Sequence, residues 1–329
     1  MKEKNQLANK HYNLIRVILW FIGFCFIFSN VQTLLMVKKH SVLTMDDFYS
    51  LEEDSLDIVL LGSSHVVNGI DSQIIENIVG KKTFSCAIIG QTAPIHVNYL
   101  KEVLKFQHPK MLIIDIYRFR MQEYKNPPLS DLHESVDGMR FSPVKFDCIY
   151  KNTAYKNIPE YIFPLIRYHS RWKELDKTDF KYLMGIRDSS NKGFFTRAKK
   201  EPQKVVSYNN STELPTLPKK TEELLNEIVS IAAFNKIDLL FVNLPYAHIN
   251  SDDNAMFSAI TIYLNKLCKA YNVRFDYVDY NYKLDNLVVD YDTDFMDISH
   301  LNENGARKIS RHLAEYINAN YILRRAISK

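Results

Sequence analysis

Two short segments of the sequence contain residue types that could carry out acyl transfer. Gly62-Ser63-Ser64 follows an apolar run, and DISHLN, residues 297–302, places an aspartate and a histidine three positions apart. A serine hydroxyl is a weak nucleophile near neutral pH until a histidine removes its proton and a carboxylate orients that histidine. At this spacing the Asp297 carboxylate can reach Nδ1 of His300 and leave Nε2 to face the serine. These residues therefore predict a triad of Ser64, Asp297 and His300.

Each segment also has a purely structural interpretation. A Gly-Ser-Ser sequence after a strand is often a turn that leads into a helix N-cap. Asp297 could cap the last helix, for which Asn302 is an equally good candidate. The presence of a serine, an acid-base pair and a well-placed glycine in one chain favours the catalytic interpretation.

The glycine is Gly90, which directly follows the second strand-like run of the sequence. An oxyanion hole needs N–H donors close to the reacting carbonyl, and a residue without Cβ allows that approach. We expect the N–H groups of Ser64 and Gly90 to form the hole. Residues at the same strand ends are candidates for a further donor, namely Gln91, Tyr117 and Arg118.

Strand-like segments alternate with helix-like segments along the body of the chain. The strand-like segments are 56–62, 83–89, 110–117, 237–244 and 273–280, and the helix-like segments are 71–80, 94–106, 221–236, 254–271 and 302–322. This alternation predicts an α/β fold with a parallel sheet covered on both faces. Functional residues of such sheets gather beyond the carboxyl ends of the strands, where the candidates above are expected to lie.

An uncharged run near the N-terminus predicts a membrane anchor. Residues 17–37 carry no formal charge over 21 positions, and about 20 apolar residues cross a bilayer core. Basic residues precede the run and acidic residues soon follow it, which favours a cytoplasmic N-terminus. A cleaved signal peptide is the alternative, but this run is long for one and lacks a small-residue cleavage site. We expect a cytoplasmic segment 1–16, a transmembrane anchor 17–37, a linker 38–54 and an extracytoplasmic domain 55–329.

Residues 118–220 interrupt the alternation and contain eight of the 11 prolines. A segment of this length within a compact domain is usually functional or has elements of its own. We expect an insertion over the carboxyl edge of the sheet, with a helical part that could line a sugar-binding cleft through His169, Arg171 and Trp172. Packing of the insertion, or a docking surface for a membrane partner, are the alternatives.

The order of these motifs resembles that of the SGNH (GDSL-like) hydrolase superfamily. Gly62-Ser63-Ser64 is similar to its first block, Gly90 to its second-block glycine, and Asp297-Ile-Ser-His300 to its last block, which continues with Leu301-Asn302 and Gly305-Ala306. The resemblance covers residues 55–117 and 220–320. It implies a flavodoxin-like, three-layer α/β/α domain with a central parallel sheet.

More narrowly, the chain looks like the membrane-anchored O-acyltransferase branch that includes DltD, AlgJ and AlgX, to which the stretch 163–175 is also similar. This resemblance implies transfer of an acyl group, with acetyl expected, from a multipass membrane O-acyltransferase through Ser64 to a surface polysaccharide or cell-wall glycan. The third family block usually supplies an asparagine, and Tyr117-Arg118-Phe119 stands at that position. Two alternatives therefore stay open: a carbohydrate esterase of the same fold, and a non-catalytic glycan-binding assembly factor.

Composition and spacing argue against several other classes. The net charge of +4 is spread over 329 residues and indicates no nucleic-acid surface. The 10 histidines and four cysteines show no metal-ligand spacing. We expect neither a metal nor a cofactor.

Overall fold

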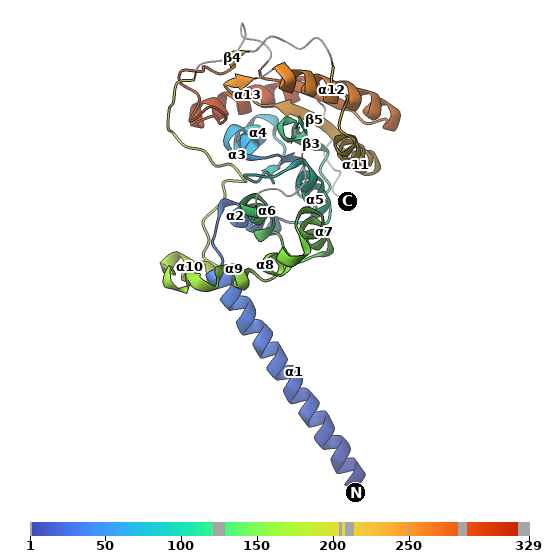
Figure 1. The fold of residues 1–329 in the computed structure, drawn as a ribbon, viewed down its shortest axis with the longest axis vertical. Coiled ribbons are helices and arrows are strands. Elements are labelled where there is room, and N and C mark those ends of the chain that lie inside the picture. Colours follow the sequence, from blue (N-terminus) through green and yellow to red (C-terminus); the bar gives the residue numbers. More distant parts are fainter. Residues whose placement is uncertain are drawn as a thin grey trace. The chain divides into compact units, whose positions relative to one another are not determined.

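The computed structural model describes residues 2–120, 129–203, 206–207, 214–249, 251–281 and 288–321. The chain divides into two compact units (Figure 1). Unit 1 comprises Met1–Lys38 and Lys156–Asp188, and unit 2 comprises Lys39–Tyr155 and Ser189–Lys329.

Unit 2 is built on a five-stranded parallel sheet. Its strands are β1 (Ile58–Leu61), β2 (Thr83–Ser85), β3 (Met111–Asp115), β5 (Asp238–Asn243) and β7 (Phe275–Asp279), in the spatial order β2-β1-β3-β5-β7. This is the strand order of flavodoxin-like folds. The predicted α/β fold with a central parallel sheet is confirmed. A short parallel pair, β4 (Val206–Ser207) and β6 (His248–Ile249), lies outside this sheet.

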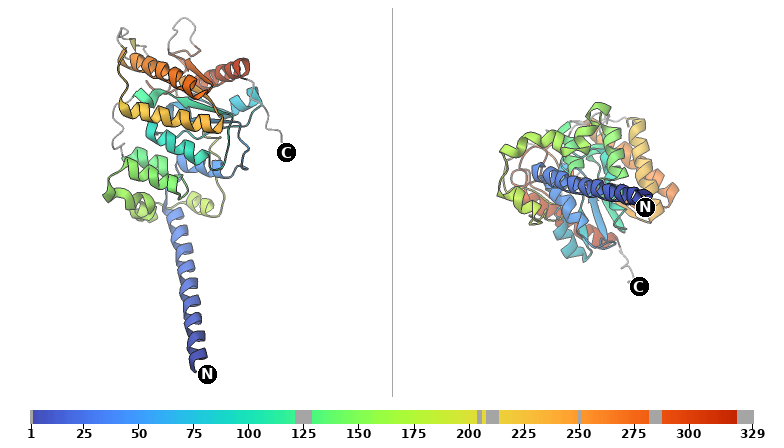
Figure 2. Two further views of the ribbon diagram at one scale, coloured as in Figure 1. Left: turned by 90° about the vertical axis from the view of Figure 1, so that its right-hand side faces the viewer. Right: turned by 90° about the horizontal axis from the view of Figure 1, so that it is seen from below.

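Helices cover both faces of the sheet, which is why its central strands are continuous apolar runs. On one face, α3 (Ser64–Gly69), α4 (Ser72–Val79) and α13 (Glu303–Asn320) share a core with alternate residues of the strands, such as Leu60 and Ile113. On the other face, α5 (Ala93–Val103), α11 (Lys219–Asn235) and α12 (Ser251–Tyr271) lie side by side (Figure 2). The result is a three-layer arrangement.

The predicted linker 38–54 contains a helix, α2 (His40–Tyr49), that belongs to the core of unit 2. Val42, Met45 and Phe48 recur every third position and are buried. The ring of Phe48 contacts that of Phe84 at the start of the sheet, with ring centroids 6.0 Å apart. Burial of this apolar stripe explains why the segment is a packed helix rather than a linker.

Residues 118–220 also differ from the single insertion predicted. Their first part, with η1 (Tyr117–Arg120), α6 (Leu129–Asp137) and α7 (Pro143–Asn152), belongs to unit 2, and so does the part from Ser189 onward. Only Lys156–Asp188 belongs to unit 1. A short turn, η2 (Tyr155–Asn157), stands at the boundary.

Unit 1 consists of one long helix and several short ones. They are α1 (Lys2–Leu35), α8 (Ile158–Ile162), α9 (Pro164–Tyr168), η3 (His169–Lys173) and α10 (Lys177–Leu183). Within α1, the 25 residues His11–Leu35 are long and apolar enough to cross a membrane. The helices α9, η3 and α10 contact α1, and α8 contacts α9.

Candidate functional site

A chain of hydrogen-bonding distances joins the three residues predicted as a triad. Oγ of Ser64 lies 2.8 Å from Nε2 of His300. Nδ1 of the same ring lies 3.0 Å from each carboxylate oxygen of Asp297. Both ring nitrogens are therefore engaged, one by a hydroxyl and the other by a carboxylate, as proton transfer from a serine requires.

Ser64 occupies the first position of α3, one residue beyond the turn that leaves β1. A glycine is required in this turn, because a Cβ on Gly62 would lie 2.3 Å from Cγ2 of Val66. The carbonyl of Ser63 accepts the first backbone bonds of the helix, from the N–H groups of Val66 and Val67. The serine hydroxyl is thus held at the edge of the sheet by a helix start rather than by a mobile loop.

The loop before α13 carries Asp297 and His300, the predicted acid and base. Oδ1 of Asp297 accepts the N–H groups of Ser299 and His300 at 2.8 and 2.9 Å, which fixes its carboxylate under the imidazole. The loop is tied to the chain beyond β5, since Ala247 donates its N–H to the carbonyl of Ile298 at 2.9 Å. Two sheet strands therefore position the site: β1 carries Ser64, and the segment after β5 holds the loop.

Asn302, and not Asp297, caps α13. Its side-chain oxygen accepts the N–H groups of Asn304 and Gly305, and its amide donates to the carbonyls of Thr293 and Phe295. Because Asn302 caps the helix, the Asp297 carboxylate remains available to His300.

The environment of Asp297 favours its charged form. Partial burial by itself raises the pKa of the carboxyl, but the N–H of Ser299 and the interactions with His300 more than offset this and hold the pKa below its usual value. The carboxylate is therefore ionised in the pH range where His300 would act as a base. The side chains of Asp297 and His300 are 44% and 25% exposed, so solvent reaches the site.

Gly90 lies in a turn beside the first residues of the site. Its φ of +76° is a conformation that favours glycine, and a Cβ there would lie 2.7 Å from Cγ of Asp131. The turn is closed by the N–H of Gln91 on the carbonyl of Ile88, whose own N–H donates to the carbonyl of Gly62. This last bond connects the Gly90 turn to the turn before Ser64.

The other candidates for the oxyanion hole have different surroundings. The Gln91 side chain is fully buried, and neither of its amide atoms has a hydrogen-bond partner within the described part of the chain. Tyr117 stacks on the ring of His65 with centroids 3.8 Å apart, and the ring of His65 in turn meets that of His300 at 5.6 Å. Arg118 lies close enough to contribute to lowering the pKa of His65.

Burial is the main reason why the pKa of His65 lies well below its usual value, so this second histidine is neutral. A neutral ring beside His300 adds no competing positive charge at the site. Burial likewise raises the pKa of the Asp115 carboxyl, which lies at the end of β3, to about 7, despite a hydrogen bond from the N–H of Tyr117.

The sequence analysis missed two contributors to this cluster. The Tyr246 ring meets that of Tyr117 at 5.3 Å, and the Arg120 guanidinium lies 4.2 Å from the centroid of the Tyr117 ring while it pairs with Asp253. Tyr246 follows the strand-like run 237–244. Its position just after this run is a signal in the sequence, because functional residues of such sheets follow the strand ends.

Residues 192–203, which begin in a turn and contain no helix or strand, connect the two halves of the site and are called the strap below. The N–H of Phe195 donates to the carbonyl of Val67 in α3. Further on, the N–H groups of Glu201 and Gln203 donate to the carbonyls of Phe295 and Tyr291. The strap therefore touches both the helix of Ser64 and the loop of Asp297 and His300.

The three residues predicted to bind substrate lie in unit 1. Nδ1 of His169 is 2.9 Å from the carbonyl oxygen of Ile166. The Arg171 guanidinium contacts the last carbonyls of α1 and the carboxylate of Asp179. Trp172 is 63% exposed. A role in substrate binding stays a prediction for all three.

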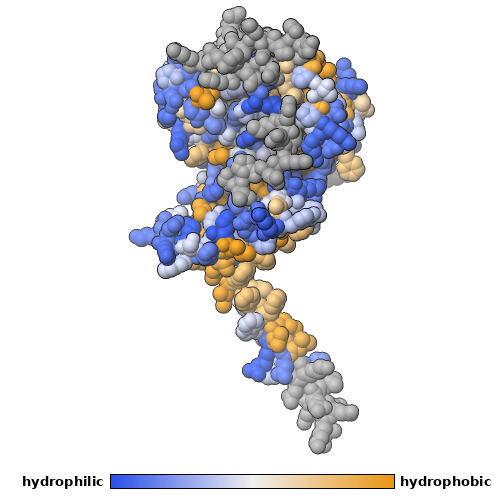
Figure 3. Space-filling model, in the orientation of Figure 1, coloured by the Kyte–Doolittle hydropathy of each residue, from blue (hydrophilic) through white to orange (hydrophobic). Residues whose placement is uncertain are grey.

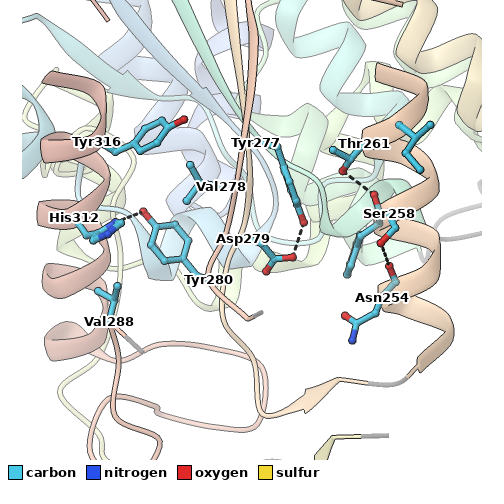
Figure 4. Close-up of a pocket in the computed structure, with 12 residues that line it drawn as sticks. Asn254, Ser258, Thr261, Tyr277, Val278, Asp279, Tyr280, Val288, His312 and Tyr316 are labelled. Atoms are coloured by element: carbon cyan, nitrogen blue, oxygen red, sulfur yellow. Dashed lines mark hydrogen bonds between the residues drawn. The ribbon is translucent and has the colours of Figure 1, made fainter. Parts of the chain in front are cut away.

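A pocket of about 710 Å³ opens beside the edge strand β7, between α12 and α13 (Figure 4). In it the Tyr277 hydroxyl donates to Asp279 and the Tyr280 hydroxyl lies 3.2 Å from Nδ1 of His312. None of the triad residues lines it. In the described ranges, no group of three or more His, Cys, Asp or Glu side chains could hold a metal ion.

Comparisons with known proteins add little to this geometry. No family model matches the sequence, and no curated protein matches it. Among solved structures, the chain is similar to an acylhydrolase candidate from Bacteroides fragilis, with a TM-score of 0.40 and 13% identity over 88% of this chain and 100% of that chain. At this TM-score the likeness by itself assigns neither fold nor function to this chain.

Proposed function

We propose that this chain is a membrane-anchored, extracytoplasmic serine O-acyltransferase of the SGNH type that acts through an acyl-Ser64 intermediate. The acyl group is acetyl in this proposal, and the acceptor is a hydroxyl of a cell-surface polysaccharide or cell-wall glycan. The single observation that carries the proposal is the run of contacts from Ser64 Oγ to His300 Nε2 and from His300 Nδ1 to Asp297.

The first half-reaction loads the serine. His300 takes the proton of the Ser64 hydroxyl as Oγ attacks the acyl carbon, and the Asp297 carboxylate stabilises the imidazolium that forms. The N–H groups of Ser64 and Gly90 would bind the oxyanion of the tetrahedral intermediate. As the intermediate collapses, the bond to the donor breaks and His300 returns the proton to the leaving group.

The second half-reaction transfers the acyl group from Ser64 to the acceptor. A glycan hydroxyl gives its proton to His300 and attacks the acyl carbon, the bond to Ser64 breaks, and the proton passes to the Ser64 oxygen. The donor in the proposal is a multipass membrane O-acyltransferase. Anchoring through His11–Leu35, with the N-terminus in the cytoplasm, would place unit 2 outside the membrane, on the side of the glycan.

Hydrolysis is the second candidate, and the exposure of the site favours it. Because the side chains of His300 and Asp297 are 25% and 44% exposed, water can reach the acyl-serine. Transfer prevails only when an acceptor hydroxyl is oriented better than water, an advantage that can reach several kcal/mol. The chain would otherwise act as a carbohydrate esterase.

The test uses the full chain in lipid nanodiscs with a chromogenic acetyl ester, with and without glycan oligomers. Alcohol release is followed optically and acetylated glycan by mass spectrometry, for the wild type and for Ser64→Ala. Ser63→Ala is the matched control, because Ser63 is adjacent and buried and its hydroxyl has no hydrogen-bond partner among the described residues.

Acetylated glycan that depends on Ser64 and not on Ser63 supports the transferase. Free acetate that glycan does not divert means an esterase. If the folded Ser64→Ala variant equals the wild type in every assay, including one with the membrane partner present, the chain is a glycan-binding assembly factor.

A further inference from the structure

Residues 156–188 of unit 1, called the collar below, expose an unusual number of large apolar side chains. Six of these 33 residues are large hydrophobics that are 44% to 69% exposed: Phe163, Ile166, Trp172, Phe180, Met184 and Ile186. Single exposed apolar side chains are common, but six within one stretch of 33 residues favour an interaction surface over an ordinary solvated one.

The collar adjoins the end of the candidate membrane span. Figure 1 shows α8, α9 and α10 lying across the C-terminal end of α1, and in Figure 3 the apolar colour of α1 continues onto this region. The ring of Phe163 meets that of Phe28 with centroids 6.2 Å apart. Phe28 precedes Leu35, the last residue of the span, by seven residues, or roughly 10 Å of helix. The collar therefore reaches back along the part of α1 that would lie in the membrane.

The length of the span places this contact at a membrane boundary. Twenty-five helical residues measure about 37 Å, which exceeds a hydrocarbon core of about 30 Å. When α1 stands close to the bilayer normal, one end of the span extends beyond the hydrocarbon core, among the lipid headgroups. A collar that packs against the last two turns of α1 lies at that depth.

The polar groups of this junction are satisfied internally, as a site poor in water demands. Nη1 of Arg171 donates to the carbonyls of Leu34, Leu35 and Met36, which the helix itself leaves without partners. Nζ of Lys38 donates to three carbonyls of the same turn. Both cations also bind the Asp179 carboxylate, whose side chain is 3% exposed.

Basic groups of the collar lie beside two aromatic rings, of which that of Trp172 is exposed and that of Tyr182 is buried. Nζ of Lys173 lies 5.5 Å from the ring centroid of Trp172, and the guanidinium of Arg187 lies 5.1 Å from that of Tyr182. Such amphipathic side chains are enriched where acyl chains meet headgroups. The collar has seven Lys or Arg against five Asp or Glu, a net charge of +2, which suits anionic headgroups.

We propose that the collar is an interfacial membrane-binding surface that lies among the glycerophospholipid headgroups of the leaflet where α1 ends. The inference rests on the membrane anchoring of the proposed function and adds a second lipid contact that a spanning helix alone does not require. Because both α1 and the collar contact lipid, the depth and tilt of unit 1 in the bilayer are fixed, and unit 1 does not rotate freely about the axis of α1.

The chain offers a direct test, because its only two tryptophans are Trp20 in the span and Trp172 in the collar. The full-length Trp20→Phe variant is reconstituted in phosphatidylcholine–phosphatidylglycerol vesicles with lipids brominated at defined acyl positions. We expect Trp172 fluorescence to be quenched several-fold more by bromine near the glycerol than by bromine near the bilayer centre, and to resist aqueous iodide.

The Trp172→Phe variant is the matched control for the anchor. If its Trp20 is quenched by brominated lipid while Trp172 in the first variant responds only to iodide, the collar proposal is wrong and the anchor stands. If Trp20 also escapes the brominated lipid, the anchor is wrong and the collar proposal is lost with it.

A photocrosslinking experiment in native membranes separates lipid from a protein partner. p-Benzoyl-phenylalanine replaces Met184 of the collar or, as the control, Phe234 of α11, which is 88% exposed in unit 2. Crosslinks to phospholipid from position 184 and not from 234 support the proposal. Crosslinks from position 184 to protein alone would overturn it and assign the collar to a membrane protein.

Discussion

Nε2 of His300 lies 2.8 Å from Oγ of Ser64 although 236 residues separate the two in the chain. The contact is maintained from both sides. Asp71, at the end of the Ser64 segment, donates its N–H to the Ser310 hydroxyl of α13 at 2.7 Å, and the strap bonds to α3 and to the loop before α13. The distance between His300 and Ser64 is therefore a property of the packed core and not of one flexible loop.

Asp297→Asn should reduce kcat for acetyl-ester turnover by about 10³- to 10⁴-fold while the protein stays folded. An amide can offer its N–H₂ to Nδ1 and stabilise the wrong tautomer, which leaves Nε2 protonated and unable to accept the serine proton. Steady-state kinetics and a circular dichroism melt measure the two effects. Asp292→Asn, an exposed aspartate of the same loop, should behave as the wild type.

The pH dependence of the wild type tests the same carboxylate. Since the pKa of Asp297 is held below its usual value of 3.8, the carboxylate stays charged as the pH falls to that value. Any acid limb of the kcat/KM profile above about pH 4.5 must then come from a group other than Asp297. An acid limb in this range that shows the small enthalpy of ionisation typical of a carboxyl would contradict this assignment.

Asp115→Asn should stabilise the protein more at pH 8 than at pH 5. Burial raises the pKa of Asp115 to about 7, so between pH 4 and 7 the folded state binds a proton that the unfolded state releases. The wild type therefore loses stability as the pH rises through this window, and the neutral amide does not. Urea denaturation at several pH values measures the difference, and a constant offset between the two proteins would show that Asp115 does not titrate as stated.

Gly90→Ala should both destabilise the fold and impair turnover. Its positive φ costs a non-glycine residue about 1 kcal/mol, and the added Cβ meets the Asp131 carboxyl at 2.7 Å. Gly80→Ala is the control, because Gly80 has a similar φ of +67° with no atom within 4 Å of the added Cβ. We expect activity to fall at least tenfold for the first variant and to persist in the second. Equal activities would remove Gly90 from the oxyanion hole.

Asn302→Ala should lower the free energy of unfolding by about 2–3 kcal/mol. The substitution removes the cap of α13 and leaves the carbonyls of Thr293 and Phe295 without the bonds they receive from this amide. Asp71→Ala removes one exposed cap bond from α4 and should cost only about 1 kcal/mol. Chemical denaturation compares the two, and a similar loss in both would mean that the inner bonds of Asn302 contribute little.

The central sheet could be predicted because its strands are short apolar runs, two of them ending at a glycine, and because helix-like segments separate them. The second run, 83–89, pairs only as far as Ser85. Ala87 and Ile88 beyond it are buried without belonging to the sheet, so apolarity indicated burial there and not strand pairing. The positions of Ser64, Asp297 and His300 followed from the strand-end rule and the spacing of the acid and the base.

Other features of the structure could not be predicted, because no local sequence pattern indicates them. The helix α3, six residues long, is shorter than two turns, so no periodicity distinguishes it from the polar turn that a Gly-Ser-Ser sequence suggests. Arg171 donates hydrogen bonds to carbonyls at the end of α1 that lie 135 to 137 positions away in the sequence. No local sequence pattern predicts contacts over such a separation. Tertiary packing alone determines both.

The strap holds its neighbours largely through main-chain groups: the N–H of Ser85 bonds to the carbonyl of Lys192, that of Phe195 to Val67, and that of Glu303 to Arg197. Every residue except proline offers the same donor and acceptor, so selection can preserve the path of this segment while most of its side chains drift. Gly193 is an exception, because a Cβ there would lie 2.0 Å from the carbonyl oxygen of Ser85. Relatives of this protein could therefore share the architecture of the site and yet differ at nearly every strap position. Such relatives would be recognised by comparing backbone structures rather than amino-acid sequences.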